Sequence, residues 1–130
     1  MRGPGLFALI MAGLAMSAAP PLGAGALTDE VAGLRVELTS RPTRPVANAD
    51  TEYAVRLVDL TGRGATGARL TLHGVMADGM SVVAPLRAAE EAGVYRGRIL
   101  FTMEGRWELT LRIAREGKRF ELSLTEHVGR

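Results

Sequence analysis

The segment from residue 93 to 113, GVYRGRILFTMEGRWELTLRI, constrains the fold of this chain more than any other part of it. Apolar and polar residues alternate along two runs that meet at a turn containing Gly105. Alternation with a period of two is typical of β-strands that bury one face and expose the other to solvent. The segment therefore predicts a β-hairpin, whose buried face carries Tyr95, Ile99, Phe101, Met103, Trp107, Leu109, Leu111 and Ile113.

Shorter segments repeat this alternation along the chain. Further strands are predicted at residues 34–39, 53–59, 68–72, 80–86 and 120–125, separated by stretches rich in Gly, Pro and Asp. Pro85 lacks a backbone donor, which favours an edge position for its strand, and residues 88–92 could form one helical turn. The pattern predicts an all-β protein: an immunoglobulin-like antiparallel two-sheet sandwich of about seven strands, with Trp107 in its core.

The first residues have the three parts of a secretory signal peptide. Arg2 supplies a positive charge, residues 6–16 form an apolar run, and Ala24 and Ala26 fit the small-residue positions of a cleavage site. The sequence therefore predicts a signal peptide at residues 1–26, one β-sandwich domain at 27–130, and a periplasmic or secreted mature protein. The alternative is a chain anchored in the membrane by an uncleaved N-terminal segment, although Pro20 and Pro21 interrupt the apolar run.

Composition limits the possible partners and cofactors. The chain contains no cysteine, so it forms no disulfide and has no thiolate metal site. Loss of Arg2 on cleavage lowers the basic count from 16 to 15 against 14 acidic residues, so the mature domain is close to neutral. The arginines alternate along strands and form no continuous basic stripe, so no nucleic-acid partner is expected.

Several short motifs occur in the order found in a known protein family. Residues 59–70 are followed by Met76 and Met80, and then by GVYRG ahead of MEGRWEL. Over residues 34–113 this order resembles YtkA-like domains, the group that includes FixH-type accessory proteins. The resemblance implies an exported bacterial β-sandwich, often encoded near copper or respiratory-oxidase functions, and it implies no enzyme activity.

One group of side chains has the chemistry of a copper site. It consists of His73, Met76, Met80 and Met103. Thioether sulfur and imidazole nitrogen are ligands that suit Cu(I). Met103 could lie at the same end of the sandwich as Met76 and Met80 or at the opposite end. The alternative is that Met76 and Met103 fill gaps in the core, since both fall in phase with buried positions.

Enzyme motifs are absent or incomplete. Gly62, Gly64 and Gly67 match the spacing G-x-G-x-x-G, but the residues that follow have strand period, whereas a dinucleotide site needs a helix there. No serine lies in a nucleophile-elbow motif. We therefore expect no enzyme. The sequence favours an exported accessory domain, with copper handling or respiratory-oxidase assembly as its role; the alternative is a metal-free interaction module that docks on a membrane or exported partner.

The cleavage site generates a direct prediction. Because Ala24 and Ala26 fit the peptidase subsites, protein isolated from the producing cell should begin at Leu27. N-terminal sequencing measures this. A mature chain that retains Met11 or Leu14 would show an anchored protein instead.

Overall fold

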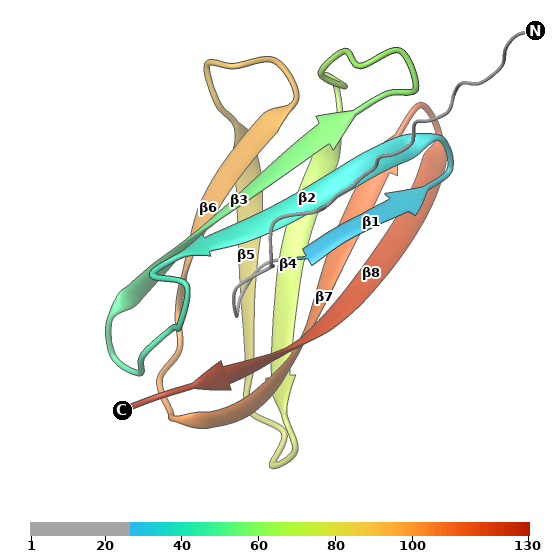
Figure 1. The fold of residues 1–130 in the computed structure, drawn as a ribbon. Coiled ribbons are helices and arrows are strands. Elements are labelled where there is room, and N and C mark those ends of the chain that lie inside the picture. Colours follow the sequence, from blue (N-terminus) through green and yellow to red (C-terminus); the bar gives the residue numbers. More distant parts are fainter. Residues whose placement is uncertain (1–26) are drawn as a thin grey trace, which may run out of the picture.

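The computed structural model describes residues 27–130, so the predicted signal peptide lies outside the described residues. This part of the chain forms eight antiparallel strands (Figure 1). They are β1 (Leu27–Val31), β2 (Leu34–Arg41), β3 (Asp50–Val58), β4 (Arg69–Met76), β5 (Ser81–Ala88), β6 (Val94–Leu100), β7 (Gly105–Arg115) and β8 (Lys118–Val128). Nothing helical between residues 27 and 130 has the length and apolar character needed to span a membrane.

The strands form two layers, and the predicted immunoglobulin-like sandwich is confirmed. The eight strands form one continuous sheet in the order β1-β2-β3-β6-β5-β4-β7-β8, which folds over between β6 and β5 so that β1-β2-β3-β6 form one layer and β5-β4-β7-β8 the other. A short pairing of β5 with β6, Arg87 with Arg96 and Ala88 with Tyr95, joins the layers along one side. Gly97 permits this approach, because a Cβ atom there would lie 2.6 Å from the carbonyl oxygen of Pro85. Pro85 itself lies where β5 pairs with β4 alone, as expected of an edge.

Alternate residues of both layers fill one core. Trp107 is completely buried, and its ring lies 5.1 Å from that of Phe101, centroid to centroid. The largest side chains that share this burial are Tyr53, Phe101, Leu38, Leu57, Leu70, Leu72, Leu109, Leu111 and Ile113. The inward positions predicted for the strands are therefore confirmed except at Met103, which is 42% exposed, and Trp107 is confirmed as a core residue.

The predicted hairpin between residues 93 and 113 is wrong in its pairing. β6 pairs with β3 and β5, whereas β7 pairs with β4 and β8, so the two strands lie in different layers. The residues between them, 101–104, form an arch that crosses from one layer to the other. A hairpin and an arch place the same alternate residues inward, which is why the sequence pattern did not separate them.

Trp107 explains why the chain crosses at this point. Its indole N–H donates a hydrogen bond to the carbonyl oxygen of Met103, at 3.0 Å, inside the arch. Phe101 enters the core at the start of the arch and packs against both Trp107 and Tyr53. The two aromatic residues thus pack against each other in the core, one on each side of the crossing.

Two smaller expectations are also corrected. β1 was not predicted, because LTDEV is short and exposes three consecutive polar residues. Residues 88–92 form no helical turn, since β5 continues to Ala88 and a turn follows. β7 and β8 are joined by a two-residue turn, in which Glu116 and Gly117 both have positive φ, 53° and 76°, as suits a tight β-hairpin.

The position of Trp107 predicts a large effect on stability. Trp107→Ala should lower the free energy of unfolding of residues 27–130 by about 3 to 5 kcal/mol, because it removes a buried aromatic residue and leaves a cavity. Urea denaturation measures this. Leu60→Ala is the control, since Leu60 is 85% exposed and its truncation should change stability by less than about 0.5 kcal/mol. Equal midpoints for the two variants would contradict the arch.

Candidate metal site at one end of the sandwich

Two methionines flank the turn that joins β4 to β5. Met76 is the last residue of β4, and Met80 immediately precedes β5. The Met76 N–H donates to the Met80 carbonyl at 2.8 Å, and the Met80 N–H donates to Oδ1 of Asp78 at 3.0 Å. Gly79 has φ of +95°, which lets the chain reverse within these few residues. The turn is therefore well defined and gives Met80 a fixed position.

The third methionine comes from the arch. The Trp107 hydrogen bond holds the Met103 backbone, while the Met103 side chain is 42% exposed. The prediction that Met103 fills the core is therefore wrong. Exposure frees its sulfur from a packing role.

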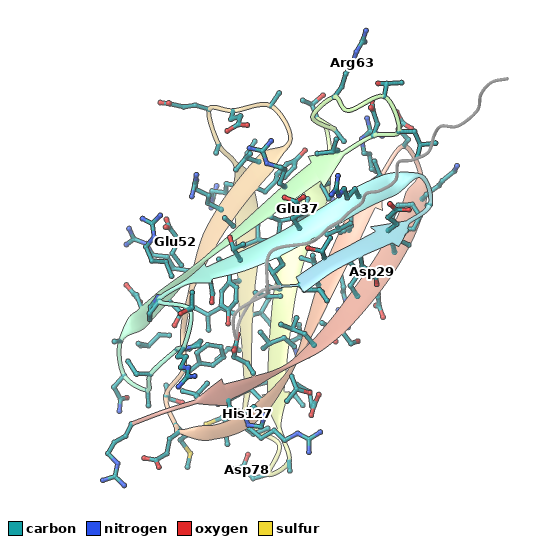
Figure 2. The ribbon with its side chains drawn as sticks, viewed as in Figure 1. Asp29, Glu37, Glu52, Arg63, Asp78 and His127 are labelled. Carbon is teal, nitrogen blue, oxygen red and sulfur yellow. The ribbon has the colours of Figure 1, made fainter. Side chains whose placement is uncertain are left out.

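Contacts join the arch to the β4–β5 turn. The Thr102 hydroxyl donates a hydrogen bond to the Met80 sulfur at 3.2 Å. The Met76 Cε lies only 2.8 Å from where a Cβ of Gly105 would stand, so this glycine makes room for the thioether. Met76, Met80 and Met103 thus gather at one end of the sandwich, the same end as Asp78 in Figure 2, and we call them the methionine rim.

The three methionines differ in burial. Met76 packs against the core and is half-buried, as the core-filling alternative predicted. Met80 is 36% exposed and contacts a loop, so packing explains it least. The rim therefore has two exposed methionines, Met80 and Met103, and a third, Met76, that is half-buried.

His73 lies away from this group. It precedes Met76 on β4 by three residues, a distance of about 10 Å along a strand. It alternates with the buried Leu72 and Gly74, which places it on the outer face of the sheet, between Val83 and Thr110 of the neighbouring strands. The structure therefore places the three predicted methionines at one end of the sandwich, whereas His73 lies away from that end. Within residues 27–130, no three His, Asp or Glu side chains gather where they could hold a metal ion.

A buried acid lies in the same end of the core, and sequence reasoning missed it. Glu126 is 2% exposed, and its Oε1 accepts a hydrogen bond from the Tyr53 hydroxyl at 2.8 Å. Register places Glu126 opposite Trp107 on β7, and Trp107 opposite Met76 on β4. The signal was available, because Glu126 continues the inward phase of Leu122 and Leu124, but the strand was predicted to end at residue 125.

Burial changes the titration of this pair. Desolvation raises the pKa of the Glu126 carboxyl; the Tyr53 hydrogen bond and the charge of His127 oppose the change but are smaller. Desolvation also raises the pKa of the Tyr53 phenol, and the neighbouring carboxylate adds to it. The Tyr53 hydroxyl therefore remains a donor over the whole neutral range.

The Glu126 pKa predicts a pH-dependent stability difference. Since the folded-state pKa lies above the ordinary 4.5, the folded chain holds more protons than the unfolded chain between the two values, and stability falls as pH rises through them. Glu126→Gln keeps an acceptor for Tyr53 and cannot ionise. It should match the wild type below about pH 4, where the carboxyl is protonated, and become the more stable protein as pH rises. Urea denaturation across this range measures the difference.

Glu121→Gln is the matched control for this measurement. Glu121 lies on the exposed face of β8 in an ion pair with Arg112, at 3.1 Å. Its removal should change stability by about 1 kcal/mol or less. A stability difference between Glu126→Gln and the wild type that stays constant with pH would contradict the assignment.

Comparisons with known proteins agree with the fold. The sequence model of the YtkA-like family matches residues 28–112. A DUF4426 family protein from Pseudomonas aeruginosa superposes with a TM-score of 0.59 at 14% identity, covering 81% of this chain and 95% of its own. The Lin-41 filamin domain gives 0.53 at 17% identity, with 85% and 97% covered.

A third solved structure is the copper-reconstituted P19 protein from Campylobacter jejuni. It has a TM-score of 0.57 at 13% identity and covers 83% of this chain and 94% of its own. At such identities these structures are alike in fold. A comparison with curated proteins finds no significant match.

Proposed function

This chain belongs to the YtkA-like family, and from that premise we propose that it is an exported, non-enzymatic accessory domain that carries one Cu(I) at the methionine rim. The cargo would pass to an exported or membrane partner. The resemblance to YtkA-like domains suggests respiratory-oxidase assembly as the process in which this copper would be used. Export follows from the predicted signal peptide, and cleavage before Leu27 would leave β1 and the whole sandwich intact.

The contact between Thr102 and Met80 is the observation that carries the proposal. It attaches the β4–β5 turn to the arch and so places Met80 and Met103, which are 36% and 42% exposed, at one end of the molecule. Thioethers are soft, uncharged ligands that suit Cu(I) and suit Zn(II) poorly. The donor set therefore fits copper in its reduced state.

Two further points support a copper role. The P19 structure was determined with copper, so a protein with this architecture has taken up the metal. The rim also lies at the surface of the molecule. A carrier needs its metal at the surface if a partner is to take it over. A Cu(I) ion held at the surface by uncharged thioethers is bound in a way that favours its release to a partner over its storage.

A metal-free interaction module is the second candidate, and the sheet edges favour it. β1 and β8 lie at the two ends of the strand order, so each pairs with a neighbour on one side only. β8 is 11 residues long and offers unpaired backbone groups along most of its outer edge. An extended segment of an exported or membrane partner could add to that edge as a further strand.

Copper binding gives the decisive test. The mature protein should bind one Cu(I) under reducing conditions, measured by competition with a Cu(I) chelator, and Zn(II) clearly less well. Met80→Leu combined with Met103→Leu should weaken Cu(I) binding at least about tenfold, or ~1.4 kcal/mol. Each swap conserves volume and should cost under about 1.5 kcal/mol of stability.

His73→Ala is the control, because His73 lies on the outer face away from the rim. Its copper affinity should equal that of the wild type. If the protein binds no copper, or if the double variant keeps the wild-type affinity, the interaction module is the function to retain.

A further inference from the structure

A cleft of about 550 Å³ lies at the end of the sandwich opposite the methionine rim. It is formed by the start of β4 and by the turn that joins β7 to β8. Figure 1 shows this turn at the upper end of β7 and β8. Its walls include Arg69, Ala114, Arg115, Glu116, Lys118 and Arg119. Four of these side chains are cationic and one is anionic, although the mature domain as a whole is close to neutral.

Strand register places two of the arginines on either side of a small residue. Ala114 of β7 pairs with Arg69 of β4 on one side and with Arg119 of β8 on the other. Neighbouring strands lie about 4.8 Å apart, so the two arginine backbones are separated by roughly 10 Å. The Ala114 methyl leaves the space between them open. Two guanidinium groups on long side chains can therefore approach a single group bound above Ala114.

The charges of the cleft are only partly compensated. Glu116 pairs with Arg115 at 3.6 Å, and the Nε of Arg115 donates to the carbonyl oxygen of Thr66 at 2.9 Å. This side chain is 22% exposed and forms a fixed wall. Among the described residues, Arg69, Lys118 and Arg119 have no ion pair with a carboxylate. Cations gathered in this way repel one another, and a bound anion would offset the repulsion.

A second arginine pair shows what the cleft adds. Arg87 and Arg96 lie directly opposite each other on β5 and β6, are exposed, and also form no ion pair among the described residues. They do not line the cleft. The pair at Ala114 differs in lining a cleft, whose other walls include Lys118 and the Arg115 side chain held by Thr66.

We propose that this cleft binds a phosphate group, with Arg69 and Arg119 donating to its oxygens and Lys118 supplying a third positive charge. The planar fork of a guanidinium matches two phosphate oxygens at once. Three uncompensated cations suit an anion of about two charges better than a single carboxylate. The phosphate comes either from free inorganic phosphate or from the headgroup of a phospholipid. The proposal is independent of copper, because the two sites lie at opposite ends of β4 and β7.

Titration with inorganic phosphate at constant ionic strength tests the site, with chloride as the balancing anion. The backbone amide signals of Ala114 and Gly117 should shift and saturate in the wild type. Arg69→Gln combined with Arg119→Gln should weaken this binding at least about tenfold. Arg87→Gln combined with Arg96→Gln removes the same charge from exposed strand positions and should leave the binding unchanged. Copper affinity should be equal in all three proteins.

A second measurement separates the two sources of phosphate. The proteins are mixed with phosphatidylcholine vesicles that contain or lack phosphatidylglycerol, and sedimentation is measured. Binding to the phosphatidylglycerol vesicles that is lost in the Arg69 and Arg119 variant assigns the cleft to a lipid headgroup; phosphate binding without vesicle binding assigns it to free phosphate. The proposal is overturned if phosphate gives no saturable shift in the wild type, whatever the vesicles do. Equal weakening in the Arg87 and Arg96 variant also overturns it, because the effect would then be one of net charge.

Discussion

The arch between β6 and β7 depends on one side chain, Trp107, and much of the structure depends on the arch. The indole ring packs on Phe101, and its N–H donates to the Met103 carbonyl, so a single residue holds the chain where it passes from one layer to the other. The same hydrogen bond orients the arch so that Thr102 meets the Met80 sulfur and the Met103 side chain faces solvent. The packing of the core and the geometry of the methionine rim therefore both depend on Trp107.

The sequence predicted which residues of each strand face the core better than it predicted which strands pair with each other. Period-two alternation identified the inward residues of β2, β3, β4 and β7, because burial on one face leaves a direct mark on residue type. The partner of a strand leaves no such mark, so Ile99 and Leu109 were predicted to share a hairpin although they lie in different layers. β1 was missed because its partly buried ends, Leu27 and Val31, are separated by three exposed polar residues.

The candidate sites show the same limit. The chemistry of Met80 and Met103 was visible in the sequence, but their position at the same end of the sandwich depends on the arch, which alternation cannot reveal. His73 was grouped with them by proximity along the chain, although its phase on β4 already placed it on the outer face. Arg69 and Arg119 are 50 residues apart, and only the order β4-β7-β8 brings them to either side of Ala114.

Replacing a hairpin by an arch also changes how this chain reaches its native state. β6 must find β3, whose residue Val55 pairs with Tyr95, and β7 must find β4, whose residue Leu72 pairs with Leu111. Each pairing closes a long loop, and this closure costs chain entropy before the strand contacts form. Folding therefore depends on contacts between residues distant in sequence, and we expect it to be slow for a domain of this size. For a protein proposed to leave the cytoplasm, slow closure of the layers would leave the chain unfolded for longer, which is the state that translocation across a membrane would require.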